Sequence, residues 1–132
     1  MKNVAEKIRK VLVSFDLEIE TAKAQLKKSN TQVYCFKDST KVYEKNKYYY
    51  GLLNQVKYKE YIRQLQQQKI DFLIQLKSVL NLYYSTYSDL WIQHFIHNKD
   101  IDEIVRENKI KKSTIKKIFK MMNQDLINYL EN

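Results

Sequence analysis

Apolar residues recur every three or four positions along the first part of the chain, which is the period of an amphipathic helix. The first series consists of Val4, Ile8, Val11, Phe15, Ile19, Ala22 and Leu26. It predicts a long helix that fades at the polar run Lys27-Lys28-Ser29-Asn30. The next stretch, Thr31 to Ser39, contains several strand-favouring residues. We interpret it as a linker, with a helix or a short strand as the alternatives.

A second helical pattern extends from about Thr40 to Tyr84. Its apolar stripe has coiled-coil spacing, with Lys69 at the one polar step, and consists of Tyr58, Ile62, Leu65, Phe72, Leu76 and Val79. Gly51 is the position at which this stretch is expected to divide into two helices. Two long amphipathic stretches favour an antiparallel hairpin over a dimeric coiled-coil contact.

The last fifty residues have a shorter pattern, typical of three helices with tight connections. These helices are predicted from Ser85 or Ser88 to His97, from Asp100 or Ile101 to Asn108, and from Lys112 or Ser113 to Leu130. We therefore predict an all-α protein with two parts. Residues 1–82 form an N-terminal long-helix hairpin or bundle for oligomerisation or partner contacts, and residues 83–132 form a three-helix, helix-turn-helix domain.

The composition agrees with a helical protein, because the 132 residues include no proline and one glycine. Hairpin-rich β folds and glycine-rich phosphate loops both need more glycine than this. The lone Cys35 excludes an internal disulfide bond. No apolar run is long enough to span a membrane, and the first ten residues lack the apolar core of a signal peptide. We expect a cytoplasmic protein without a membrane partner.

The formal net charge is +9, from 24 basic and 15 acidic residues. Lysine dominates, and AT-rich coding is an alternative explanation for part of this bias, since asparagine, isoleucine and tyrosine are also abundant. The window from Lys109 to Lys120 nevertheless holds six lysines and no acid. The preceding predicted helix carries the acids instead, at Asp100, Asp102, Glu103 and Glu107. Positive charge is thus concentrated on the turn and the last helix.

The apolar residues around this window have the spacing of a helix-turn-helix. Ile104 and Val105 face inward from one short helix, Ile110 fills the turn, and Ile115 and Ile118 share a face of the next helix. A solvated lysine face is the simpler interpretation of the charge alone. We favour binding to double-stranded DNA because the apolar spacing, the tight turn and the one-sided lysines coincide.

Each residue of the window has an expected role at a DNA surface. Phosphates are to be neutralised by Lys109, Lys111 and Lys120, and base edges contacted by Lys112, Ser113, Lys116 and Lys117. Thr114 is expected to bond to phosphate or base. No acid pair, nucleophile with a base, or cofactor loop stands out, so we expect neither an enzyme nor a cofactor. His94 and His97 lack a cluster that would complete a metal site and are interpreted as surface histidines. Trp91 is interpreted as a core residue.

The C-terminal part also resembles a known family. The segments that carry the resemblance are Leu90-Trp91-Ile92-Gln93-His94-Phe95-Ile96, Asp102-Glu103-Ile104-Val105, Ile110-Lys111-Lys112-Ser113-Thr114-Ile115 and Ile118. Together they resemble the promoter-reading region four of bacterial sigma factors, and are similar to small phage regulators of the ArpU/RinA type. The resemblance covers roughly Leu76 to Leu130. It implies a sequence-specific DNA-binding regulator, with activation of phage late genes as one role, and a third helix in the major groove.

That family has glycine where Lys109 stands, so either Asn108 or Lys109 is expected to adopt a left-handed backbone conformation, and asparagine does so more readily. Two alternative functions remain open. One is a small sigma-like factor that recruits RNA polymerase, and the other is a helical interaction protein that binds an acidic partner. A homodimer through the N-terminal helices is also compatible with the pattern.

One further stretch, Lys45 to Arg63, interleaves basic residues with tyrosines. Such a mixture is typical of a surface that tracks single-stranded nucleic acid, or of an amphipathic helix whose tyrosines pack inward with their hydroxyls at the rim. We favour packing.

Overall fold

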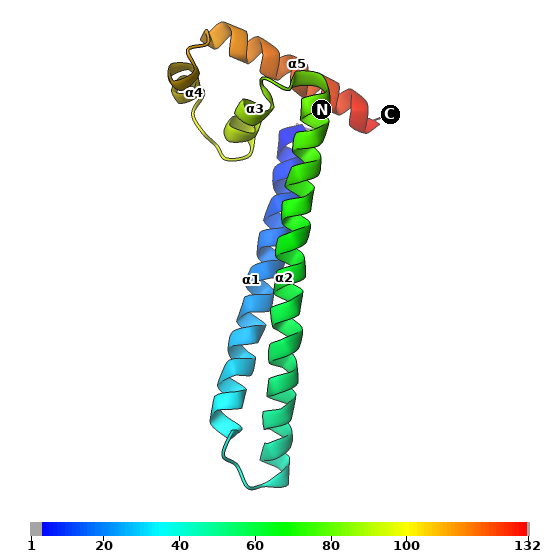
Figure 1. The fold of residues 1–132 in the computed structure, drawn as a ribbon, viewed down its shortest axis with the longest axis vertical. Helices are drawn as coiled ribbons and strands as arrows, with labels where there is room; N and C mark the ends of the chain where they lie inside the picture. Colours follow the sequence, from blue (N-terminus) through cyan, green and yellow to red (C-terminus); the bar gives the residue numbers. More distant parts are fainter. Residues whose placement is uncertain (1–3, 132) are drawn as a thin grey trace. The chain divides into compact units, whose positions relative to one another are not determined.

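The computed structural model describes residues 4–131, with the backbone alone for residue 83 and residues 129–131. Over this range the chain is all-α and contains no strand (Figure 1). The helices are α1 (Val4–Phe36), α2 (Val42–Tyr84), α3 (Ser88–Phe95), α4 (Ile101–Asn108) and α5 (Lys112–Glu131). The predicted all-α fold, with two long helices packed together before shorter ones, is confirmed. Among the described residues, no helix is both long and apolar enough to cross a membrane.

The contacts divide the chain into two compact units. The hairpin unit comprises residues 13–70, and the core unit comprises residues 1–12 together with residues 71–132. This division differs from the boundary that the sequence places at residue 82. The reason is that Val4, Ile8 and Leu12 at the start of α1, and Leu80 near the end of α2, belong to the same apolar cluster as Trp91 of α3.

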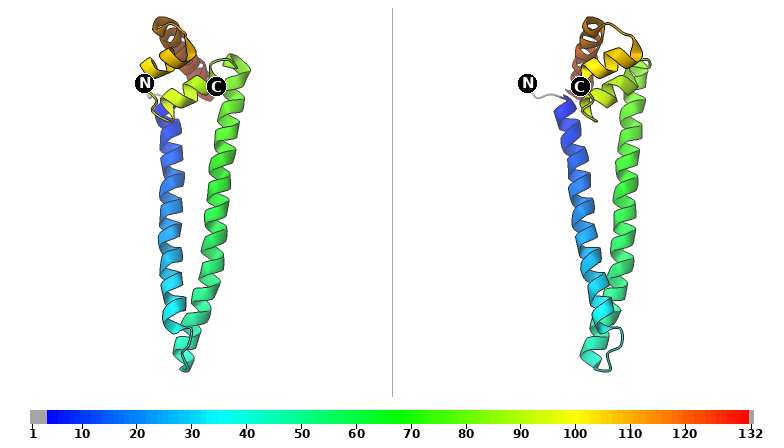
Figure 2. Two further views of the ribbon diagram at one scale, coloured as in Figure 1. Left: turned by 60° about the vertical axis from the view of Figure 1, so that its left-hand side comes forward. Right: turned by 90° about the vertical axis from the view of Figure 1, so that its left-hand side faces the viewer.

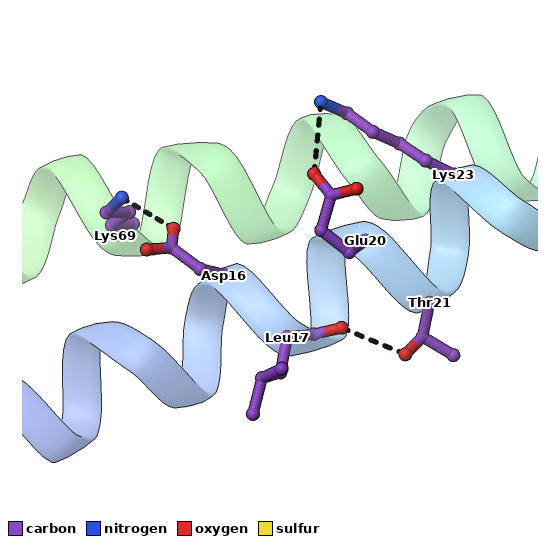
Figure 3. A network of polar contacts seen from close by, with 6 residues as sticks. All are labelled: Asp16, Leu17, Glu20, Thr21, Lys23 and Lys69. Carbon is purple, nitrogen blue, oxygen red and sulfur yellow. Dashed lines mark hydrogen bonds and ion pairs between the residues drawn. The ribbon is translucent and has the colours of Figure 1, made fainter.

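In the hairpin unit, α1 and α2 run in opposite directions beside one another (Figure 2). Ile19 and Ala22 of α1 and Leu65 of α2 are buried between them. Polar side chains also connect the two helices, as where Lys69 Nζ lies 2.6 Å from Asp16 Oδ1 (Figure 3). The antiparallel hairpin predicted from the apolar stripes is therefore present. Lys69, the one polar residue in the second stripe, forms an ion pair with Asp16 of α1.

The linker predicted at Thr31 to Ser39 is wrong for residues 31–36, because α1 passes through the polar run and continues to Phe36. Between α1 and α2, only residues 37–41 lie outside a helix. Packing on α2 outweighs the low helix propensity of this stretch. Gln32 Nε2 donates a hydrogen bond to the carbonyl oxygen of Lys47 at 2.6 Å. Val33 lies directly against Gly51.

Gly51 does not divide α2, which is continuous from Val42 to Tyr84. A Cβ atom at Gly51 would lie 2.8 Å from Val33 Cγ2, closer than real Cβ contacts. The glycine therefore serves close approach of α1 and α2, a role that a helix-breaking interpretation misses.

The core unit is built around side chains from all five helices. Its fully buried members include Trp91 of α3, Ile104 of α4, and Ile115 and Met122 of α5. In the third turn of α1, Leu12 is buried, whereas the neighbouring Val11, which the first apolar stripe included, is 40% exposed. The stripe thus shifts by one residue at this point. The core holds α3, α4 and α5 in fixed positions, and so determines which face of α5 is exposed.

Candidate nucleic-acid interface

Helix α4 begins and ends where the sequence indicates, at Ile101 and Asn108. Asp100 is its N-cap, and the carboxylate accepts a hydrogen bond from the backbone N–H of Asp102 at 3.1 Å. Ile104 is completely buried and anchors α4 in the core. The predicted start of this helix at Asp100 or Ile101 and the predicted inward-facing role of Ile104 are both confirmed, so the first half of the candidate motif forms as expected.

The turn after α4 adopts a left-handed conformation at Lys109, with φ 54° and ψ 39°. The sequence favoured Asn108 for this role, and that preference is wrong. Asn108 is the last helical residue, and its side-chain amide donates to the carbonyl oxygen of Ile104 at 2.9 Å. Because Asn108 is occupied in this way, the next residue reverses the chain. A residue with a Cβ atom pays about 1–2 kcal/mol for that conformation.

Helix α5 begins at Lys112 and continues without interruption to Glu131. Ser113 is therefore a first-turn residue of α5. The inner face of α5 is fixed by Ile115, Phe119 and Met122, all of which are buried. Trp91 lies against the same core, fully buried, and its indole N–H donates to Asn123 Oδ1 at 2.9 Å. The core role predicted for Trp91 is confirmed.

All eight residues predicted to contact DNA are exposed in the structure, on the turn or on the outer part of α5. They are Lys109, Lys111, Lys112, Ser113, Thr114, Lys116, Lys117 and Lys120. Lys112, Lys116 and Lys120 follow one another at four-residue intervals, so they form a row along one side of the helix. Among the residues whose side chains the structure describes, none forms an ion pair with the other lysines of this set. Their charges are available to a partner.

Lys112 differs from the other lysines because its Nζ lies 2.8 Å from Asp102 Oδ1 of α4. This hydrogen bond, with the attraction between the two charges, lowers the pKa of the Asp102 carboxyl and raises the pKa of Lys112. Both side chains remain solvent-accessible, so the pair contributes little to stability. It does hold the first turn of α5 against α4, and it partly neutralises one predicted base-contacting lysine.

A shallow cavity of about 430 Å³ lies beside the lysine row. Its apolar wall includes Phe95 and Phe119, and Lys116 and Lys120 stand at its edge. His94 also lines it, stacked on Phe119 with ring centroids 5.6 Å apart. The Nδ1 atom of His94 is 2.7 Å from the carbonyl oxygen of Lys99, which requires a proton on that nitrogen. His94 is thus a half-buried packing residue, not the surface histidine that the sequence suggested, whereas His97 is exposed.

The tyrosine- and lysine-rich stretch on α2 is only partly packed. Tyr48 and Tyr58 are half-buried, but Tyr49 and Tyr50 are 59% and 64% exposed. Tyr61 is 44% exposed. The expectation that these tyrosines pack inward is therefore wrong for Tyr49, Tyr50 and Tyr61.

Comparison of the chain with protein-family models, with curated proteins and with solved structures gave no match. Within residues 4–131 there is also no group of three or more histidine, cysteine, aspartate or glutamate side chains that could hold a metal ion. The functional interpretation therefore depends on the geometry of α4, the turn and α5.

Proposed function

We propose that this protein is a sequence-specific transcriptional regulator that binds double-stranded DNA with α5 in the major groove. The observation that carries the proposal is the division of α5 into two faces. Ile115 and Phe119 fix one face in the core, while the opposite face and the turn present exposed lysines without an acid among them. A short capped helix, a tight turn and a basic second helix form the arrangement that helix-turn-helix proteins insert into DNA.

Most of the affinity in this proposal comes from phosphate contacts. Lys109, Lys111 and Lys120 neutralise backbone phosphates and release the counterions condensed there. Ser113, Lys116 and Lys117, on the outer face of α5, reach base edges and supply sequence preference.

Lys112 contributes to DNA binding after its ammonium group leaves the Asp102 carboxylate and binds a group of the DNA. In the pair it already lies at the start of α5, where a recognition helix meets the bases. The similarity to sigma region four supports a role at promoters, including activation of phage late genes. The proposal involves no enzymatic activity and no cofactor.

The proposal is tested by the salt dependence of binding to duplex DNA. The variant K116A/K117A/K120A removes three exposed lysines from α5, and K27A/K28A/K59A removes three exposed lysines from α1 and α2 as a matched control. Affinity is measured by fluorescence anisotropy over a range of salt concentrations. Removal of one phosphate contact reduces the slope of log K against log salt by about 0.9. The α5 variant should bind more weakly with a flatter slope, and the control should keep most of the parent's affinity.

Equal affinity of the α5 variant and the parent would refute the assignment of these lysines. A protein with no footprint on any duplex and a stoichiometric complex with an acidic protein would be an interaction protein instead. Tight promoter binding only in the presence of core RNA polymerase, together with co-purification of the polymerase, would identify a sigma-like factor.

A further inference from the structure

A row of side chains on α2 within the hairpin unit is exposed and is apolar at both ends. Leu53, Val56 and Ile70 are 66%, 69% and 50% exposed. The row continues through Glu60, Arg63 and Gln67, so its members are separated alternately by three and four residues. This is the spacing of one face of a helix that packs against another helix in a coiled coil. We call these six residues the outer row.

The middle of the outer row is charged. The guanidinium of Arg63 donates hydrogen bonds to both carboxylate oxygens of Glu60, with Nε 3.0 Å from Oε2 and Nη2 2.5 Å from Oε1. Both side chains remain largely exposed. They are available for a second interaction while bonded to each other.

The outer row is symmetric about the midpoint between Tyr61 and Ile62. Leu53 and Ile70 are equally distant from this midpoint, as are Glu60 and Arg63. Val56 has Gln67 as its counterpart. When a second outer row runs antiparallel to the first, an aliphatic residue therefore lies opposite an aliphatic residue at each end, and opposite charges face each other in the middle.

We propose that the outer row pairs with the outer row of a second copy of this chain, with the two α2 helices antiparallel about a two-fold axis at that midpoint. Leu53 then lies opposite the partner's Ile70, and Glu60 lies opposite the partner's Arg63. The same contacts occur twice, as a two-fold interface requires. The inference concerns self-association and does not depend on binding to DNA.

Charge complementarity identifies a second copy as the occupant and fixes the direction. In the antiparallel pair, two glutamates and two arginines alternate around the axis. In a parallel pair each glutamate would face a glutamate, and each arginine would face an arginine, which disfavours that arrangement. Pairing also removes the exposed leucine, valine and isoleucine from water.

The charges are tested first, by sedimentation of the full chain over a range of concentrations. The parent should approach twice the chain mass of 16.0 kDa. E60R places four arginines at the axis and R63E places four glutamates there, so each single variant should raise the dissociation constant at least tenfold. The double variant E60R/R63E restores the alternation and should return to within a few-fold of the parent. The pair Glu20–Lys23 on α1, also separated by three residues, supplies the controls E20K and K23E, which should not change the dissociation constant.

The register and direction are tested by disulfide formation in a C35S background. Chains carrying L53C and chains carrying I70C should form a mixed disulfide when combined. Neither should cross-link to itself, since residues seventeen positions apart on antiparallel helices are separated by about 25 Å along the axis. Self-cross-linking of L53C would overturn the antiparallel arrangement. A chain that stays monomeric at all concentrations, or a double charge variant no better than the single variants, would overturn the interface.

Discussion

Replacement of Gly51 by alanine tests how closely the two long helices approach. An alanine in place of glycine inside a helix normally stabilises the folded state by about 1 kcal/mol. Here the added Cβ atom would lie 2.8 Å from Val33 Cγ2, well inside the ordinary contact range of 3.4–4 Å. Val33 is β-branched and cannot easily rotate away in a helix. Overpacking of this kind costs about 1–3 kcal/mol. The expected net effect of G51A is a destabilisation of about 0–2 kcal/mol.

Removal of the obstructing methyl group should reverse the sign. In the V33A background the nearest remaining atoms are the backbone nitrogen of residue 33 at 3.4 Å and Gln32 Cγ at 3.5 Å, which a Cβ atom tolerates. In that background G51A should stabilise the hairpin by about 1 kcal/mol through helix propensity. The coupling free energy between the two substitutions should therefore be about 1–3 kcal/mol, because G51A is unfavourable beside valine and favourable beside alanine at position 33.

The cycle of four proteins is measured by urea denaturation followed by circular dichroism, with the dependence on denaturant compared across variants. If G51A raises stability by the same amount in the presence of Val33 and of alanine at that position, the close approach of α1 and α2 is refuted.

Three further substitutions test the core unit and its exposed face. K109G should raise the free energy of unfolding by about 1 kcal/mol, measured by thermal or chemical denaturation, because glycine adopts the left-handed conformation without the steric cost of a Cβ atom. K109A keeps a Cβ atom and should not raise it. D102N should tighten binding to duplex DNA, because Lys112 no longer has a charged partner in the protein and is free to reach a base edge; an unchanged affinity would exclude Lys112 as a DNA contact. N123A leaves the buried Trp91 N–H without its acceptor and should lower the free energy of unfolding by about 1–3 kcal/mol, while an unchanged value would show that the bond contributes nothing.

The parts of the fold that local signals determine could be predicted from the sequence. The bounds of α4 follow from the Asp100 cap and from the apolar spacing around Ile104. The antiparallel hairpin follows from two long apolar stripes. Where tertiary contacts outweigh local preference, the sequence was misleading. Residues 31–36 look unlike a helix, but they are helical because they pack on α2, and Gly51 looks like a break but is a contact.

The sequence predicted which residues of the candidate interface are exposed, but it did not predict the ion pair within that interface. The exposure of the six predicted residues that lie on α5 follows from the positions of Ile115 and Ile118 on the opposite side of the helix. The bond between Lys112 and Asp102 depends on the angle between α4 and α5, which no local pattern specifies. The left-handed residue was misassigned to Asn108 for a similar reason, since its amide is used to bond the carbonyl oxygen of Ile104.

Selection of bound sequences from a pool of random DNA duplexes tests the central claim most directly. The parent chain should enrich a single sequence motif, and K116A/K117A/K120A should abolish that enrichment. A palindromic motif would in addition indicate that a dimer binds. If the parent retains no duplex, or if the α5 variant enriches the same motif as strongly as the parent, α5 is not the recognition helix of a DNA-binding regulator.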